Sequence, residues 1–168
     1  MRIRRHALPW LVAVILIVLF LVARSGGGGF PSFDDARGAR VQRVVDGDTV
    51  RLLGLGSVRL IGVNTPEVYG QVQCFGPEAS AFAKSVLRPG TRVRYQVGRE
   101  AHDRYGRLLA YVWLEDGRLF NAMLVEGGYA VPLTIAPNDQ LAPRFRSEEA
   151  QARRASAGMW RRPGCAPG

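Results

Sequence analysis

Acidic and basic side chains recur at short spacings between residues 46 and 107. Asp48 follows an Asp-Gly pair, Glu67 lies soon after Arg59, and Arg107 ends the run Asp-Arg-Tyr-Gly-Arg. A carboxylate just after a tight turn is a suitable hard oxygen ligand for a cation such as Ca²⁺. A planar guanidinium contacts two phosphate oxygens at once. These residue types predict a site for a cation and a phosphate, although a plain hairpin turn and solvated arginines explain each segment alone.

Two other kinds of site are not indicated. After Asp46 and Asp48 the next alternate position is Val50, and no glutamate closes the loop, so the segment is not an EF-hand. His102 beside Asp103 resembles half of a catalytic triad, but no serine or cysteine nucleophile accompanies the pair. A turn is the better interpretation of that dipeptide.

Four fragments occur in one order along the chain: Val45–Val50, Arg59–Glu67, Gly76–Ser80 and Asp103–Arg107. In this order and spacing they resemble the thermonuclease (staphylococcal nuclease-like) family, over nearly the whole domain from about Val41 to Trp160. The resemblance implies an exported, Ca²⁺-dependent endonuclease that hydrolyses phosphodiester bonds of DNA and RNA.

The resemblance also implies a set of metal ligands. Asp48 matches the family's first metal-binding aspartate, and Thr65 matches a position that offers its backbone carbonyl to the ion. Asn64 stands where the family's best-known member has a second aspartate. An asparagine carbonyl can coordinate Ca²⁺ but brings no charge, so we expect weaker calcium binding here. Asp46 is expected to support the site through water.

Three further residues match the family's catalytic positions. Glu67 matches the glutamate proposed to activate the attacking water, and a role in orienting that water is an open alternative. Arg59 and Arg107 match the two arginines that hold the scissile phosphate. Negative charge increases on the phosphate oxygens in the transition state, and fixed guanidinium groups stabilise that charge.

The resemblance extends to the binding of the nucleotide. Arg104 and Tyr105 match positions that hold the neighbouring phosphate, with arginine in place of the family's lysine. Leu133 and Ile135 occupy the region where the best-known member has tyrosines that stack on the base. Base stacking contributes roughly 1 to 3 kcal/mol per base, so substrate affinity or preference is expected to differ.

The N-terminal part of the chain indicates export. The apolar run Ala7–Ala23 follows several arginines, and its length lies between a signal-peptide core and a membrane-spanning helix. Residues 1–25 are therefore either a cleaved signal peptide or a membrane anchor that leaves the domain outside the cytoplasm. Residues 26–38 are expected to form a glycine-rich linker, residues 39–162 the domain, and residues 163–168 a tail.

The two cysteines, Cys74 and Cys165, are interpreted with the export signal. An exported domain would use them for one disulfide, and two unrelated buried thiols are the alternative. A structural zinc site is not indicated because two thiols provide too few ligands.

The elements that must position these residues follow from the apolar pattern. Short β-rich runs are expected around residues 41–45, 50–52, 58–61, 91–97 and 108–114, the first three as an antiparallel meander. Helices are expected from Pro77 to Leu87, around residues 119–124 and over residues 144–157. Five strands with about three helices predict a five-stranded OB-type Greek-key barrel, a β-barrel with helices (α+β).

Composition agrees with an anionic partner without requiring one. The chain of 168 residues has a net charge of +9, which favours nucleic acid or an acidic polymer. We expect a monomer that acts on DNA and RNA. The alternatives are a catalytically impaired OB-fold module that binds nucleic acid or an anionic envelope polymer, and a structural envelope protein held by its anchor.

Overall fold

The structure is a computed structural model that describes residues 29–162 and 164–165. All its elements belong to the unit Pro31–Gly168, one of two units into which the chain divides. The strands are β1 (Arg37–Val44), β2 (Thr49–Leu52), β3 (Gly56–Leu60), β4 (Val63–Asn64), β5 (Arg92–His102), β6 (Leu108–Leu114) and β7 (Val131–Pro132). The helices are α2 (Gly76–Val86), α3 (Phe120–Glu126), α4 (Ala142–Arg154) and the 3₁₀ helix η1 (Gly158–Arg161).

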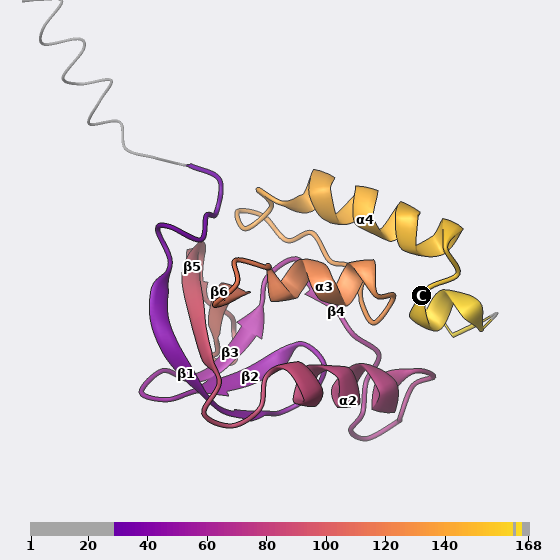
Figure 1. Ribbon diagram of the computed structural model, residues 1–168, viewed down its shortest axis with the longest axis horizontal. Helices are drawn as coiled ribbons and strands as arrows, with labels where there is room; N and C mark the ends of the chain where they lie inside the picture. The colour runs from indigo at the N-terminus through magenta and orange to yellow at the C-terminus, as the bar shows by residue number, and fades with distance from the viewer. Residues whose placement is uncertain (1–28, 163, 166–168) are drawn as a thin grey trace, which may run out of the picture. The chain divides into compact units, whose positions relative to one another are not determined.

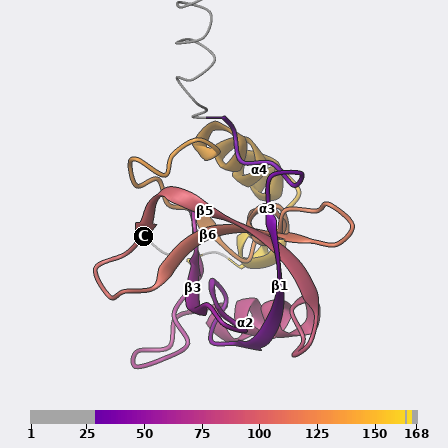
Figure 2. The ribbon, with the colours of Figure 1, turned by 90° about the vertical axis from the view of Figure 1, so that its left-hand side faces the viewer.

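Five strands close into a barrel in the order β1-β2-β3-β6-β5 (Figures 1 and 2). The neighbours β1, β2 and β3 are antiparallel, as the predicted meander requires, and β5 pairs antiparallel with both β1 and β6. The parallel pair β3–β6 completes the closure. The predicted five-stranded barrel with helices is therefore confirmed.

The barrel interior is filled by the alternate apolar residues of its strands. In β2 and β3, Val50, Leu52, Val58 and Leu60 are almost fully buried, while Arg51 between the first two is partly exposed. Alternation of this kind is the pattern of a strand with one face on the core. It also means that Arg59, between Val58 and Leu60, points away from the interior.

Helix α2 closes one end of the barrel (Figure 1). Its first turn carries a proline, which is tolerated where backbone N–H groups have no partner within the helix. Ala79, Ala83 and Leu87 are buried against the core, on the face that the sequence predicted. The helix begins shortly after the loop that carries Glu67.

The contacts of the domain extend N-terminal to its predicted boundary at Ala39. Arg37 and Gly38 already pair with β5, and the Ser32 N–H donates a hydrogen bond of 2.9 Å to the Gln96 side chain. The predicted linker over residues 26–38 therefore includes the start of β1. Phe33 and Arg37 of this segment have partners on β5, because Arg94 lies 4.5 Å from the centroid of the Phe33 ring and Arg37 pairs with Tyr95.

Two sequence predictions fall wholly or partly outside the described residues. The apolar run Ala7–Ala23 is one of them, and much of the tail 163–168 is the other. Within the described residues, none of the helices has both the length and the apolar character needed to cross a membrane.

Candidate active site

The Asp-Gly-Asp turn joins β1 to β2 and is held by its own backbone and side chains. The N–H groups of Val45 and Asp46 donate to the Thr49 carbonyl at 2.8 and 3.3 Å, and the Asp48 N–H donates to Asp46 Oδ1 at 3.1 Å. A Cβ atom at Gly47 would lie only 2.6 Å from side-chain atoms of Thr65. The turn therefore needs glycine because Thr65 packs directly against it.

Asp48 is a buried carboxylate surrounded by donors. Its Oδ2 accepts hydrogen bonds from the Thr65 N–H at 2.8 Å and the Thr65 hydroxyl at 3.1 Å. Its Oδ1 lies 3.1 Å from Arg59 Nε and 3.3 Å from the Thr49 hydroxyl. Burial raises the pKa of the Asp48 carboxyl, and the Arg59 guanidinium opposes that rise. Burying a charged group costs free energy unless the group is paired and hydrogen-bonded. These donors therefore stabilise the buried Asp48 carboxylate.

Arg59 occupies the centre of this cluster. Besides its contact with Asp48, its Nη1 donates to the carbonyls of Leu60 and Val63, each at 2.7 Å, and its Nη2 donates to Asn64 Oδ1 at 3.1 Å. The side chain is 12% exposed. Five N–H donors in a planar fork allow one residue to serve four acceptors.

The three predicted metal ligands are brought together. Asp48 bonds directly to Thr65, and Asn64 contacts the same guanidinium as Asp48. Asn64 belongs to β4, which is fixed by pairing with β7. A carboxylate, an amide carbonyl and a backbone carbonyl are the oxygen donors that suit Ca²⁺, so the donor set fits in kind. Within the described residues no group of three or more His, Cys, Asp or Glu could hold a metal ion.

Glu67 stands apart from this cluster. It is exposed, and among the described residues its carboxylate has no hydrogen-bond partner. Its backbone is well held, because its N–H donates to the Gln73 side chain and its carbonyl accepts from the Gln73 N–H, both at 2.9 Å. The carboxylate is thus free on a fixed main chain.

The turn between β5 and β6 presents Arg107. Asp103 Oδ1 accepts from the backbone N–H groups of Tyr105 and Arg107, and its Oδ2 binds Arg107 Nε at 2.7 Å. Burial alone would raise the pKa of Asp103, but the hydrogen bonds from Arg107 and Tyr105 outweigh it and lower that pKa. No hydrogen-bond partner is found for the Arg107 Nη atoms within the described part of the chain.

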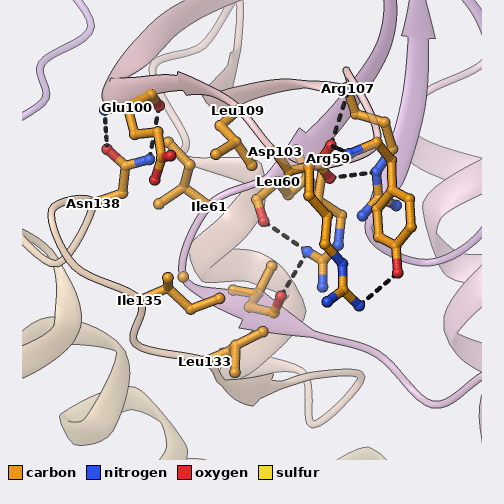
Figure 3. A pocket seen from close by; sticks show the side chains of 14 residues that line it. Arg59, Leu60, Ile61, Glu100, Asp103, Arg107, Leu109, Leu133, Ile135 and Asn138 are labelled. Carbon is orange, nitrogen blue, oxygen red and sulfur yellow. Dashed lines mark hydrogen bonds and ion pairs between the residues drawn. The ribbon is translucent and has the colours of Figure 1, made fainter.

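Both arginines line one pocket of about 490 Å³ on the outside of the barrel (Figure 3). The guanidinium groups lie near one end, and apolar side chains of β3, β6 and the segment after β7 form the wall. The lining residues are Arg59, Leu60, Ile61, Gly62, Val63, Glu100, Asp103, Arg104, Tyr105, Arg107, Leu109, Leu133, Ile135 and Asn138. Asp48, Asn64, Thr65 and Glu67 are not among them.

Arg104 and Tyr105 lie at the exposed edge of this pocket. Arg104 Nη2 donates to the Tyr105 hydroxyl at 2.6 Å, and its guanidinium lies 4.8 Å from the ring centroid. Arg107 lies 5.4 Å from the same centroid. The ring therefore sits beside two cations, an arrangement favoured by the negative face of the aromatic system.

Three residues at this site had no predicted role. Asp103 orients Arg107. Its position in a turn motif, four residues before an arginine, is the sequence feature that could have indicated this role. Asn138 pairs with the backbone of Glu100 through both amide atoms, at 3.1 and 2.9 Å. Glu100 and Asn138 come from distant parts of the chain, so no local pattern indicated their contact.

Comparison with known proteins shows which family the chain resembles. Residues 57–162 match the family described as staphylococcal nuclease homologue. A thermonuclease of Staphylococcus intermedius is 38% identical over 161 residues, which cover 90% of this chain and 95% of that protein. A thermonuclease of Staphylococcus hyicus is 34% identical over 160 residues, with 89% and 94% covered. Endonuclease YhcR of Bacillus subtilis (strain 168) is 38% identical over 145 residues, 77% of this chain and 12% of that protein.

The family match covers more than half of the chain and includes the three arginines that line the pocket, Arg59, Arg104 and Arg107. The two thermonucleases align over nearly the full length of both partners. The closed five-stranded barrel agrees with the predicted resemblance. The chain therefore belongs to the staphylococcal nuclease homologue family.

Proposed function

We propose that this phosphodiester-hydrolysing nuclease is an exported, Ca²⁺-dependent endonuclease that cuts DNA and RNA. The observation that carries the proposal is the pair of arginines in one pocket, each with its Nε fixed by a carboxylate. Asp48 binds Arg59 at 3.1 Å and Asp103 binds Arg107 at 2.7 Å. Such fixed cations have little reorganisation to undergo when a phosphate arrives.

The arginines act on the charge of the reacting phosphate. When water attacks phosphorus, negative charge increases on the non-bridging oxygens, and a guanidinium aimed at them lowers the energy of that state. Arg107 is one third exposed and has unoccupied Nη donors within the described part of the chain. We therefore assign it the more direct contact, with Arg59 at the inner edge.

Glu67 serves the attacking water in this proposal. The water oxygen forms a bond to phosphorus as one of its protons passes to the Glu67 carboxylate, or to solvent if Glu67 only orients the water. The bond from phosphorus to the leaving nucleotide oxygen breaks, and that oxygen takes a proton from solvent. A general base has to be accessible to the water from which it takes a proton. The exposed, unpartnered carboxylate of Glu67 meets that requirement.

The proposed calcium ligands are Asp48, Asn64 and the Thr65 carbonyl, with Asp46 acting through water. A bound Ca²⁺ supplies positive charge that offsets the charge of the phosphate oxygens. Asp48 would bring the one direct carboxylate, and Arg59 already contacts both Asp48 and Asn64. The neighbouring guanidinium repels a cation, which adds to the effect of Asn64 in weakening calcium binding.

Export is supported by two features of this chain. Arginines precede the apolar run Ala7–Ala23, and the cysteines of the domain are paired in a disulfide, a bond typical of compartments outside the cytoplasm. Cleavage at the end of the run would give a secreted nuclease, and retention would give one anchored at the cell membrane. We propose that the active form is a monomer.

Digestion of plasmid DNA and of RNA, with Ca²⁺ or with EDTA, tests the activity. We expect cleavage of both substrates with Ca²⁺ and loss of cleavage in EDTA. Glu67→Gln and Arg107→Ala should each lower kcat by about 10² to 10³. Arg118→Ala is the matched control, because it removes an arginine paired with a carboxylate on an exposed turn, 2.6 Å from Asp116. Full activity in EDTA, or in both site variants, would contradict the mechanism.

Asn64→Asp tests the metal ligands separately. A second carboxylate should tighten calcium binding about tenfold because it adds a full negative charge to the oxygen donors. Calorimetric titration of the protein with Ca²⁺ in the absence of substrate measures this. An unchanged dissociation constant would exclude Asn64 as a ligand.

A further inference from the structure

The loop that carries Glu67 is closed by one residue, Gln73. The Gln73 side-chain oxygen accepts from the Glu67 N–H, and the Gln73 N–H donates to the Glu67 carbonyl, both at 2.9 Å. This two-bond clamp holds the backbone of Glu67 from the far end of the loop. Any change in the position of Gln73 is therefore transmitted to Glu67.

The first residue of α2, Gly76, contacts both Gln73 and Glu67. The Gly76 N–H donates to the Gln73 carbonyl at 3.1 Å. The backbone of Gly76 lies so close to the Glu67 carbonyl that a Cβ atom at this position would collide with it. Glu67, Gln73 and the first residue of α2 are thus in mutual contact through main-chain atoms.

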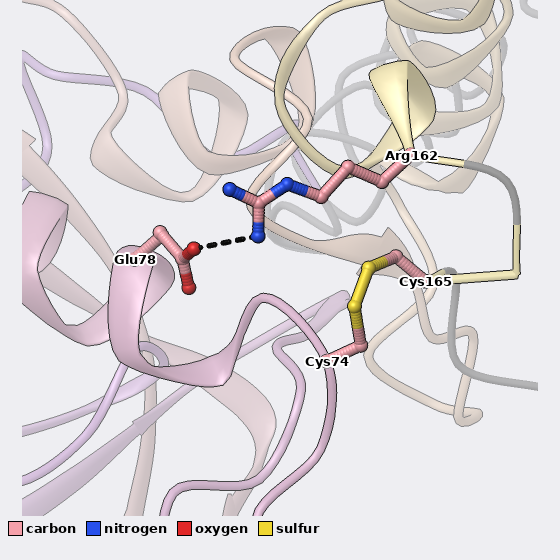
Figure 4. The surroundings of a disulfide bond; sticks show 4 residues. All are labelled: Cys74, Glu78, Arg162 and Cys165. Atoms are coloured by element: carbon pink, nitrogen blue, oxygen red, sulfur yellow. Dashed lines mark hydrogen bonds and ion pairs between the residues drawn. A yellow bond between two sulfur atoms is a disulfide. The ribbon is translucent and has the colours of Figure 1, made fainter.

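The residue after Gln73 is bonded covalently to the C-terminal part of the chain. Cys74 forms a disulfide with Cys165, 91 residues away, with a Cα–Cα distance of 5.0 Å (Figure 4). Arg162 adds an ion pair of 2.9 Å to Glu78 of α2 and lies over the Phe75 ring at 5.5 Å. The bridge and the ion pair lie side by side in Figure 4 and join the C-terminal segment to the beginning of α2.

We propose that Gln73 is a positioning residue for Glu67 and that the Cys74–Cys165 disulfide holds Gln73 in place, so that the oxidised bridge sustains the rate of hydrolysis. This inference rests on the proposed role of Glu67 in handling the attacking water. Gln73 acts through the backbone of Glu67 and has no contact with the phosphate in this scheme. The bridge acts one step further away, through the residue next to Gln73.

The need for an external tether follows from the loop itself. Residues 65–75 contain neither a helix nor a strand, and Tyr69 and Val72 are 61% and 58% exposed. The Tyr69 hydroxyl bonds to the Val45 carbonyl at 2.8 Å, an exposed contact near the acidic turn. A segment with few buried apolar contacts opens at low cost in free energy. Covalent attachment at Cys74 limits that opening at the end where Gln73 lies.

Two substitutions at Gln73 separate its hydrogen bond from its shape. Gln73→Met keeps the length of the side chain but removes the acceptor, and we expect kcat to fall about tenfold with KM changed less than about twofold. Gln73→Glu keeps an oxygen acceptor and should restore most of the lost rate. A double-mutant cycle gives the positioning readout, because Gln73→Met should have no further effect in the Glu67→Gln protein.

The bridge is tested with the Cys74→Ser/Cys165→Ser protein and with wild type reduced by dithiothreitol, assayed well below the unfolding temperature of each. Both should lose about tenfold in kcat with little change in KM. Dithiothreitol should have no effect on the double serine variant. Glu78→Gln is the control, because it removes the neighbouring ion pair and leaves the disulfide intact.

The outcomes separate this inference from the proposed function. If Glu67→Gln retains full activity, the role of Glu67 fails and the positioning role fails with it. If Glu67→Gln is inactive while Gln73→Met and the double serine variant match wild type in kcat, only the positioning inference is overturned. A lower unfolding temperature without a change in kcat at low temperature would also overturn it, because the bridge would then serve stability alone.

Discussion

At the scale of single residues, the site depends on arginine rather than on positive charge in general. Arg59 uses its Nε for Asp48, its Nη1 for two backbone carbonyls and its Nη2 for Asn64. A lysine ammonium is a compact charge and could not reach these separate acceptors in one plane. Arg107 has fewer partners and greater exposure. The two arginines are therefore chemically alike but differ in their freedom to meet a phosphate.

The carboxylate of Asp103 gives a prediction for the rate of hydrolysis. Asp103→Asn weakens the contact with Arg107 Nε, which is 2.7 Å from the carboxylate, and we expect kcat to fall about tenfold. Asp116→Asn, at an exposed arginine pair of the same kind, should keep full activity. Equal losses in the two variants would contradict a specific role for Asp103.

The same carboxyl also affects stability, with a defined sign. Hydrogen bonds lower the pKa of Asp103 in the folded protein below its ordinary value of 3.8. The contribution of Asp103 to the free energy of unfolding is therefore fully present above the pKa of the unfolded state. It is lost as the pH falls through the lower pKa of the folded state. Thermal unfolding between about pH 6 and pH 2 should show a shallower acid decline in Asp103→Asn than in wild type. An identical decline would exclude this contribution.

At the scale of elements, the long strands and helices of the fold were predictable from sequence. The barrel strands β2, β3 and β5 alternate apolar with polar residues over much of their length, β6 is a continuous apolar run, and α2 has a proline in its first turn. Elements β4 and β7 were missed. Each has two residues, and the pairing of Val63 with Pro132 joins positions far apart in the chain. A pair that short has no periodicity to detect.

The site residues that belong to a sequence motif were predictable, whereas the contacts made by loop residues were not. The resemblance pointed to the residues that meet around Asp48 and Arg59. It did not indicate the clamp between Gln73 and Glu67 or the pairing of Asn138 with Glu100. These are side-chain contacts with backbone, and they exist only once the loops have been placed by the barrel and by α2.

The buried side-chain amide of Asn121, on helix α3, is expected to contribute to the stability of the fold. Its Oδ1 accepts from the Val112 N–H at 3.0 Å, and its Nδ2 donates to the Ile61 carbonyl at 2.8 Å. Asn121→Leu would leave both backbone groups buried without this partner and should lower the free energy of unfolding by about 2 to 4 kcal/mol.

Denaturant unfolding measures this change, with the slope m expected to stay constant. Gln151→Leu, an exposed amide on α4, is the control and should change stability by less than about 0.5 kcal/mol. If the free energy of unfolding falls by a similar amount in both variants, the hydrogen bonds of Asn121 do not have the specific stabilising effect expected here.

At the scale of the whole molecule, charge and pocket geometry act together on the substrate. The chain carries a net charge of +9, and the exposed Arg104 stands at the edge of the pocket that contains Arg107. A polynucleotide that binds this surface displaces counterions from its phosphates, so its affinity falls as salt rises. A substrate with a single phosphodiester displaces fewer and should be less sensitive.

Steady-state kinetics with both substrates between about 50 and about 200 mM NaCl tests this expectation. KM for single-stranded DNA should rise on the order of tenfold, while KM for a dinucleotide should rise much less. Arg104→Gln should reduce the slope of log KM against log salt by about one for the polymer, because one phosphate contact is lost. Arg154→Gln, which removes an exposed charge from the end of α4, should leave that slope unchanged. Equal slopes for the two arginine variants would mean that net charge, and not the edge of the pocket, guides the polymer.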